Sequence, residues 1–555
     1  MTKIRQMTVQ MLATVTLGIL LCGGAKMAAD DGTDAAMAQI RPESLQADMR
    51  FLADDLLEGR GTATRGHQIA AKFMATRFEG YGFQPAGDHG SYFQIVPLRM
   101  MHVDAGATTL AVTQDGKAVS LKFGQDFLTT PDPGRGDTTV DAPIVFVGYG
   151  VTAPDENYDD YSKVDVHGKI VAYFYGAPNF QSSLKAHFSS TEMKAKNAVA
   201  HGAVGMLLLF DPIRESSYPF AKVSRDATAA KFRWLSKEGK PNAYFPELKA
   251  LASVSVAESK KLFEGSGHTA EEEFAAAKEG KLTSFPLKAT ARIHVVTKAQ
   301  DVQSMNVVAK LEGSDAALKE QYVVYTAHLD HLGIGAPVKG DSIYNGALDN
   351  ASGSAALLEL ARAFSSLNPR PKRSILLVSV TGEEAGLLGS DYFATYPTVP
   401  KGELVADINL DEILMLWPIK DVVAFGAEHS SLQKDVGMAA ERLHLTESED
   451  PMPQEVVFIR SDQYSFVKQG IPAVMLMPGF QSEDANLHPA ELFEKWQETR
   501  YHQPQDDMNQ PGLNFESGAK LVRLAFLSGY YVSETAERPT WNAGDFFGEN
   551  YGNGR

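Results

Sequence analysis

Residues 322–331 read YVVYTAHLDH, an apolar run that passes directly into two histidines and an aspartate. A short apolar run bounded by polar residues predicts a strand buried on both faces, as in a parallel sheet. Similar runs follow at 375–380, 405–410, 456–459 and 473–477, and helical patterns lie at 352–364 and 384–394. Strands that alternate with helices predict an α/β fold: an open, mostly parallel mixed sheet with helices on both faces.

Potential metal ligands follow these predicted strands at the points where the strands end. They are His328, Asp330 and His331 after the first strand, Glu383 and Glu384 after the second, Asp411 and Glu412 after the third, and Asp462 after 456–459. In open α/β sheets, ligands bind in the crevice beyond the carboxyl ends of the strands. We therefore expect these side chains to converge on one site, where imidazoles and carboxylates could bind a metal ion.

Each motif also has an ordinary structural interpretation. A carboxylate at Asp330 can fix the tautomer of a nearby ligand such as His328, yet such pairs are common on surfaces. Asp349 precedes a predicted helix and is suited to cap it. The adjacent Glu383 and Glu384 are more specific, because two carboxylates without a basic neighbour repel each other unless a cation is bound.

A late histidine ligand has two candidates. His502 lies in YHQPQDD (501–507), and His488 lies in NLHP (486–489). Neither stretch has helical or strand periodicity, and a surface histidine is the ordinary interpretation of both. Their spacing does not choose between them.

Five motifs in order carry a family resemblance: HxDH, LDNASG, GEE, NLD and YHxPxD. Together they resemble the co-catalytic di-zinc aminopeptidase family related to the secreted bacterial leucine aminopeptidases. The helical segment ending in EGRG (58–61) looks like the family's N-terminal piece, and residues 148–169 resemble an inserted protease-associated domain. The resemblance implies a zinc-exopeptidase-like fold with a small β-rich insertion.

The resemblance also implies two Zn²⁺ ions and their ligands. Asp349 would bridge the two ions. His328 and Asp411 would complete one site, and Glu384 and His502 the other. This assignment selects His502 over the competing histidine.

Further roles follow from the same resemblance. Glu383 would be the general base, Asp330 would orient the first histidine ligand, and Tyr501 would donate to the oxyanion. Asp462 matches a recurrent Ser-Asp support position and, with Glu412, is expected at the substrate. Glu412 stands where the family usually carries an apolar residue, often methionine, so the shape of the substrate pocket is expected to differ.

The expected organisation has five parts. They are a signal peptide (1–25), an N-terminal part of the catalytic domain (40–140), an inserted protease-associated domain (141–295), a di-zinc catalytic domain (296–535) and a C-terminal tail (536–555). The inserted part is expected because β-rich runs such as PIVFVGYGV (143–151) and KIVAYFY (169–175) begin near residue 141.

The N-terminus has the pattern of an export signal. Lys3 and Arg5 precede an apolar run at 7–21, and small residues follow at 23–25. We expect a periplasmic or extracellular protein without a stable membrane span. An uncleaved anchor and a lipid anchor on Cys22 are the alternatives, although Leu21 stands where a lipoprotein would carry a small residue.

These features predict a zinc-dependent exopeptidase that removes N-terminal residues from peptide or protein substrates through a metal-bridged hydroxide and a glutamate base. A net charge of −17 argues against nucleic acid as a partner. A carboxypeptidase or other amide hydrolase on the same scaffold is the alternative. A binding protein on a catalytically inactive peptidase scaffold is a further alternative. Inactive relatives of this kind have lost metal ligands, whereas the ligands are all present here. The sequence does not give the oligomeric state.

Overall fold

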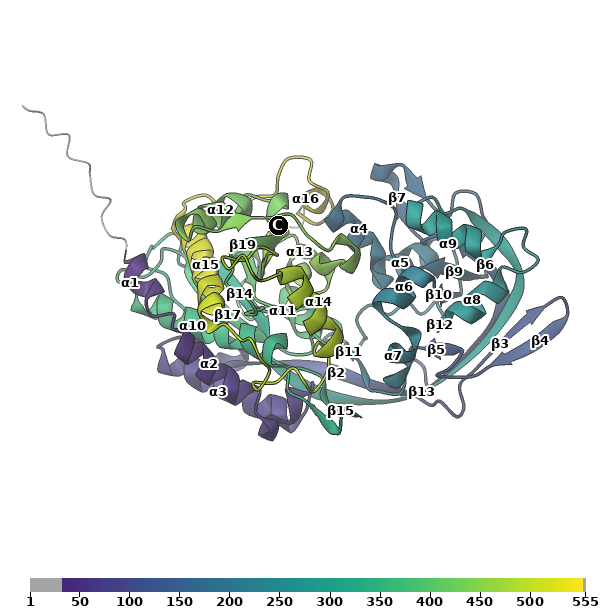
Figure 1. The fold of residues 1–555 in the computed structure, drawn as a ribbon, viewed down its shortest axis with the longest axis horizontal. Coiled ribbons are helices and arrows are strands. Elements are labelled where there is room, and N and C mark those ends of the chain that lie inside the picture. Colours follow the sequence, from purple (N-terminus) through teal and green to yellow (C-terminus); the bar gives the residue numbers. More distant parts are fainter. Residues whose placement is uncertain (1–31, 553–555) are drawn as a thin grey trace, which may run out of the picture.

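The computed structural model describes residues 32–552, so the predicted signal peptide and Cys22 lie outside the described residues. Within this described range, no helix combines the length and apolar character needed to cross a bilayer. Apart from two small two-stranded sheets, the strands form two sheets that share one 28-residue strand, β13 (Ser284–Leu311). Figure 1 shows β13 running beneath both halves of the molecule and joining them.

The first sheet is built around β14 (Tyr322–His328). This strand lies between β17 (Ser374–Val380) and β18 (Leu404–Asn409), and both are parallel to it. β21 (Ala473–Pro478) continues the parallel part beside β18. Every residue of these four strands is buried, as expected for strands covered on both faces.

The edges of this sheet are antiparallel. The C-terminal half of β13 pairs with β17, and β2 (Phe93–Val103) runs antiparallel along β13. At the other edge, β19 (Asp421–Phe425) runs antiparallel to β21 and parallel to the short β20 (Thr446–Glu447). The predicted fold class, an open and mostly parallel mixed sheet, is confirmed.

Helices cover this sheet on opposite faces. α10 (Ser352–Ser366) and α15 (Phe515–Glu534) pack on each other and on β14, whereas α11 (Leu388–Thr395) packs on α13 (Gln463–Val467). The connection through α10 leads from β14 to its neighbour β17 on one side. The connection through α11 then leads in the opposite direction across the sheet, from β17 past β14 to β18. Because crossovers between parallel strands are right-handed, α10 and α11 must lie on opposite faces.

An outer layer lies against α10. It contains α2 (Pro42–Leu52), the tight turns of η1 (Asp55–Arg60) and α3 (Arg65–Gly80). The helix expected to run on to Leu57 ends at Leu52, and residues up to Arg60 form η1 instead. Glu58 and Gly59 have positive φ angles of 50° and 66° there, which interrupts the helix.

The second sheet has the strand order β4-β3-β13-β6-β9-β10-β12-β5. The strands that it adds are β3 (Thr109–Gln114), β4 (Lys117–Leu121), β5 (Phe127–Thr129), β6 (Asp137–Val147), β9 (Ile170–Phe174), β10 (Gly205–Leu209) and β12 (Leu251–Val254). Its helices are α4 (Ser182–Ser189), α5 (Thr191–Ala200), α6 (Pro212–Ser217), α7 (Phe220–Arg225), α8 (Val256–Leu262) and α9 (Ala270–Glu279). Because β3, β4 and β5 precede residue 141, this sheet begins earlier in the chain than the expected boundary.

One predicted strand is wrong. Residues 456–459 are a left-handed Val456 followed by a turn of 3-10 helix, η8 (Val457–Ile459). Four apolar residues are too few to distinguish a strand from a buried turn. α4, from the other half of the molecule, packs against this turn. The predicted helix 384–394 also begins later, at Leu388, so Glu383 and Glu384 lie on the turn that follows β17.

Candidate metal centre

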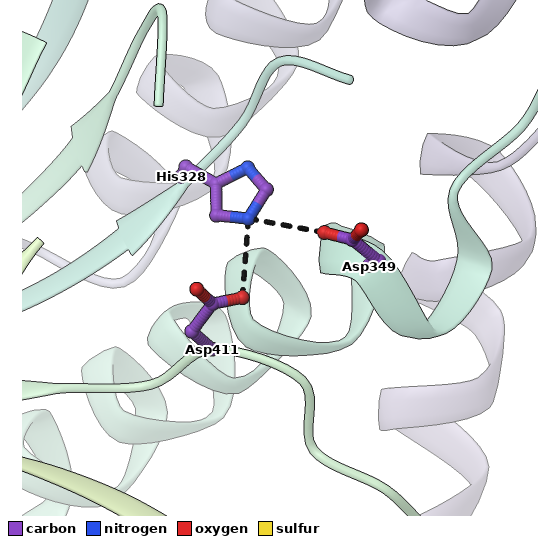
Figure 2. Close-up of side chains that lie close together, drawn as sticks. All are labelled: His328, Asp349 and Asp411. Atoms are coloured by element: carbon purple, nitrogen blue, oxygen red, sulfur yellow. Dashed lines mark hydrogen bonds and ion pairs between the residues drawn. The ribbon is translucent and has the colours of Figure 1, made fainter. Parts of the chain in front are cut away.

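The first ligand group lies beyond the carboxyl ends of β14 and β18, as Figure 2 shows. His328 ends β14, Asp411 follows β18, and Asp349 comes from the short helical turn η4 (Ala347–Ala351). The Nε2 atom of His328 lies 3.1 Å from Asp411 Oδ1 and 3.2 Å from Asp349 Oδ1. All three side chains are buried, and their ligand atoms are close enough to hold one metal ion.

The second group uses the other oxygen of Asp349. His502 Nε2 lies 3.2 Å from Asp349 Oδ2 and 3.2 Å from Glu384 Oε2. The structure therefore brings together all five predicted ligands, with Asp349 between the two groups. His488, the competing histidine, is exposed at the N-cap of α14 (Pro489–Thr499) and belongs to neither group among the described residues.

His331 also lies in the second group; it was one of the potential ligands at the end of the first strand, but the family resemblance gave it no role. Its ring is fully buried, and its Nδ1 lies 2.6 Å from Glu384 Oε1 and 3.8 Å from Asp349 Oδ2. The HxDH motif contained this residue, but its spacing from His328 did not distinguish a ligand from a buried structural histidine.

Asp330 contacts His328 through a different group than expected. The Nδ1 of His328 lies 3.0 Å from the main-chain carbonyl of Asp330, which can only accept, so Nδ1 carries a hydrogen and Nε2 faces the carboxylates of Asp349 and Asp411. The carboxylate of Asp330 points elsewhere and accepts from Thr62 Oγ1 at 2.8 Å and from the main-chain N–H of Glu383 at 3.2 Å. The expectation that this carboxylate orients His328 is therefore corrected.

The loop that carries Asp349 is fixed by Asp506, the last residue of YHxPxD. The buried Asp506 carboxylate accepts from the main-chain N–H groups of Leu348 and Asp349 at 3.0 to 3.1 Å. These bonds satisfy the donors at the start of the turn and set the direction of the Asp349 side chain. The sequence motif contained Asp506 but did not reveal this function.

Arg60, from EGRG, joins the two ligand-bearing loops. Its buried guanidinium donates to the carbonyls of Leu329, Asn345 and Gly346. Burial lowers the pKa of Arg60 to about 10, so it stays cationic at neutral pH. A single arginine in a Gly-rich turn has no periodicity that would have predicted this role.

The electrostatics of the two groups favour positive charge between the carboxylates. Although burial opposes ionisation, neighbouring imidazoles hold the pKa of Asp349 well below its usual range and lower the pKa of Glu384 to about 2. Burial opposes protonation of His502, yet Glu384 and Asp349 raise its pKa to about 10. Ionised carboxylates and cationic partners thus stabilise each other here, and divalent cations would supply the same charge.

The donor set fits zinc. Three buried ligand atoms, Asp349 Oδ2, Glu384 Oε1 and His331 Nδ1, have no hydrogen-bond partner among the described residues. Leaving a buried polar atom unpaired costs about 1–3 kcal/mol. Three such atoms in one group, all imidazole nitrogens or carboxylate oxygens, are what a zinc site requires.

A pocket of about 570 Å³ opens beside the two groups. Its apolar wall contains Met452, Val457, Met475, Met477, Phe493 and Trp496, and its acidic residues are Asp349, Glu383, Asp411, Glu412 and Glu455. Asp462 is fully buried and does not line the pocket, so the predicted substrate contact of Asp462 is corrected. Its neighbour Ser461 does line the pocket and donates a hydrogen bond to Asp411.

Glu412 lines the pocket in a left-handed backbone conformation, with φ of 52°. His502 shares this feature, with φ of 56°. Such conformations cost non-glycine residues about 1–3 kcal/mol and are concentrated at functional sites. Burial raises the pKa of Glu412 well above its usual range, and the nearby Asp349 and Asp411 add to this effect.

Tyr501 and Arg460 also line the pocket. Arg460 Nη2 donates to the Tyr501 hydroxyl at 2.9 Å, and its Nη1 lies 3.5 Å from Glu455 Oε2. Burial raises the pKa of Tyr501 well above its usual range, so the residue stays a phenol. Because the hydroxyl oxygen accepts from Arg460, its own hydrogen is available to a bound ligand.

Comparisons with known proteins point to one family. Residues 306–522 match peptidase family M28. The mouse aminopeptidase NAALADL1 is 33% identical over 133 residues, which are 23% of this chain and 16% of that protein. A probable zinc metalloprotease of Pyrenophora teres f. teres is 37% identical over 112 residues, 20% of this chain and 23% of that one. These matches span less than a quarter of either relative.

The fold of nearly the whole chain has a solved counterpart. The aminopeptidase of Aneurinibacillus sp. strain AM-1 aligns over 92% of this chain and 97% of its own, with a TM-score of 0.53 and 19% identity. At this identity the similarity concerns the fold alone, and it includes both sheets.

Proposed function

Because residues 306–522 match peptidase family M28, we propose that the chain is a zinc-dependent exopeptidase that removes N-terminal residues from peptides. The observation that carries this proposal is the pair of ligand groups that share the buried Asp349 at the edge of an acidic pocket. An exported location and an inserted protease-associated domain, formed by the second sheet, belong to the same proposal.

Two zinc ions would be held at the two groups. His328, Asp349 and Asp411 would hold one ion, and Asp349, Glu384 and His502 the other. Bound there, zinc polarises a carbonyl and makes water acidic enough to supply a nucleophile at neutral pH. The ligands themselves are held in position by Asp330, Asp506 and Arg60.

Glu383 is the proposed general base. It lines the pocket, and its Oε2 lies 3.9 Å from His328 Nε2, at the edge of the first group but not within hydrogen-bond distance of it. Burial raises its pKa well above the usual range, and the carboxylates of Asp411 and Glu384 contribute. Such a carboxylate can accept the proton of an attacking water and pass it to the leaving amine.

Tyr501 is the proposed donor to the oxyanion. Its phenol is protonated at neutral pH, and Arg460 donates a hydrogen bond to its oxygen. A fixed donor of this kind stabilises the negative charge that develops in the transition state and needs no reorganisation during the reaction.

The acidic side of the pocket is proposed to bind the substrate's α-ammonium group. Glu383, Asp411 and Glu412 all line the pocket next to the ligand groups. An ammonium needs carboxylate acceptors, whereas a terminal carboxylate needs a cationic clamp, usually arginine. The apolar wall would receive the first side chain of the peptide.

The test is a panel of free and N-acetylated peptides, assayed with and without chelator. We expect chelator to abolish hydrolysis and zinc to restore it. N-acetylation should lower kcat/KM by about two orders of magnitude, which is roughly 3 kcal/mol for one lost charge-assisted contact. Equal rates on blocked and free peptides would contradict the proposal.

One observation favours the alternative, a carboxypeptidase. Arg460 lines the pocket and is a cation that a terminal carboxylate could use. However, Arg460 already contacts Tyr501 and Glu455. The acidic residues that line the pocket would also repel a terminal carboxylate. Release of C-terminal residues in the same assay would select this alternative.

A further inference from the structure

His331 has the geometry of a metal ligand rather than of a packed core histidine. It lies just beyond the end of β14, and its side chain has an exposed fraction of 0%. Its Nδ1 is 2.6 Å from Glu384 Oε1, and its ring meets that of His502 edge to face with centroids 5.8 Å apart. The imidazole therefore faces the second ligand group directly.

The close contact between His331 Nδ1 and Glu384 Oε1, at 2.6 Å, is an ion-pair contact. Neither atom has any other hydrogen-bond partner among residues 32–552. Asp349 Oδ2, 3.8 Å from the same nitrogen, also lacks one. His331, Asp349 and Glu384 can each offer one ligand atom such that all three atoms lie within 4.8 Å of one another, which suits them to share a cation.

The backbone around His331 holds the ring in this orientation. Its main-chain N–H donates to the Arg60 carbonyl at 3.3 Å. Gly346 packs against the ring so closely that a Cβ there would lie 2.5 Å from His331 Cγ, and its φ of 58° also favours glycine. A ligand fixed in advance loses little conformational entropy when a metal binds.

We infer that His331 is a fourth protein ligand of the metal ion held by Asp349, Glu384 and His502. This inference rests on the proposed di-zinc centre. The two sites then differ: one has four protein ligands, and the other has three, His328, Asp349 and Asp411. Structural zinc sites have four protein ligands, whereas catalytic sites keep a position open for water or substrate. The four-ligand site should therefore retain its zinc more tightly, and the three-ligand site is the open one.

Zinc retention by matched variants tests this assignment. Asp places a carboxylate oxygen where His331 has Nδ1, whereas Asn places a poor ligand there. In zinc-buffered dialysis we expect the wild-type chain to hold one zinc tightly and one weakly. His331→Asn should raise the dissociation constant of the tight zinc by more than ~100-fold, beyond the usual effect of an outer partner. His331→Asp should stay within about tenfold of wild type, and the control His488→Asn should be unchanged.

A crystal structure of the zinc-loaded wild-type chain tests the same inference without any variant, so it does not depend on the folding of His331→Asn. We expect an Nδ1–zinc distance of about 2.0–2.1 Å. Two bound zinc ions with His331 Nδ1 more than about 3 Å from both would overturn this inference and leave the proposed function standing. A wild-type chain that binds no zinc would overturn both.

Discussion

The carboxylate of Asp330 accepts a hydrogen bond from the main-chain N–H of Glu383, with 3.2 Å between oxygen and nitrogen. The main-chain carbonyl of the same aspartate lies 3.0 Å from His328 Nδ1. One residue thus fixes a ligand at the end of β14 and the turn after β17 that carries the proposed base. This arrangement keeps the two neighbouring glutamates at defined positions, and the predictions below test their separate roles.

Separate substitutions of Glu383 and Glu384 should distinguish a catalytic role from a metal-binding role. Glu383→Gln removes only a proton acceptor, so we expect full zinc content and a fall in kcat of about 10²–10⁴. Glu384→Ala removes a ligand, so we expect loss of one zinc and lower stability, because bound metal stabilises the state that binds it. Metal analysis and thermal unfolding with and without zinc are the measurements. Two zinc ions in both variants would show that the roles are assigned wrongly.

Arg460 and Tyr501 should act as a pair. Tyr501→Phe removes the proposed oxyanion donor, and we expect kcat to fall by about 10²–10³ with little change in KM. Arg460→Lys cannot hold the hydroxyl in the same way, so a smaller fall in the same direction is expected. A double-mutant cycle measures the coupling between them. Strictly additive effects would mean that Arg460 does not position the phenol.

Glu412 should contribute to recognition of the free amine. Glu412→Gln keeps the size of the side chain and removes a carboxyl group whose ionised form a bound ammonium would favour, against the effect of burial on its pKa. We expect kcat/KM on free peptides to fall by about tenfold, since one charge-assisted contact is weakened, and we expect N-acetylated peptides to be little affected. Both substrate series should be measured in parallel. An equal loss on both series would assign Glu412 to the shape of the pocket instead.

A charged contact at the C-terminal end should make stability depend on pH. His429 Nδ1 lies 2.6 Å from Asp545 Oδ2, and His429 Nε2 lies 2.8 Å from Ser183 Oγ. Burial opposes protonation, yet Asp545 and Glu428 raise the pKa of His429 from 6.5 to about 9. In Figure 1 the C-terminal helix α16 (Phe546–Tyr551) lies beside α4, so this contact joins the two halves.

Because the pKa of His429 is raised on folding, the contact stabilises fully below pH 6.5, and its contribution is lost as the pH rises through about 9. Asp545→Asn keeps an oxygen that can cap α16 but removes the charge. We expect it to lower the free energy of unfolding by about 1–3 kcal/mol at pH 6 and by much less at pH 10. Denaturant unfolding at both pH values is the measurement, and the same loss at both would contradict the ion pair.

The exported form should lack the first residues. Lys3, Arg5 and the apolar run at 7–21 predict cleavage after Ala25, so N-terminal sequencing of the exported protein should begin near Lys26. A soluble cytoplasmic chain that keeps Met1 would contradict this expectation. Labelling with a radioactive fatty acid would reveal a lipid anchor at Cys22.

The composition of an apolar run was sufficient to predict a strand where the run was at least five residues long. The runs that became β14, β17, β18 and β21 are buried throughout, so their composition alone identifies strands of a covered parallel sheet. The run at 456–459 was misread because it is short, and its conformation depends on a left-handed Val456 and on packing against α4. Local composition does not contain that contact.

By itself, the sequence determined the fold class and the convergence of ligands, because parallel strands bring the residues after their carboxyl ends to one edge of the sheet. Only the tertiary structure decided which atoms meet there. In the structure the carboxylate of Asp330 accepts a hydrogen bond from Glu383 rather than contacting His328, and His331 is buried against Glu384. Such choices depend on side-chain directions set by distant segments such as EGRG and YHxPxD, and spacing along the chain does not encode them.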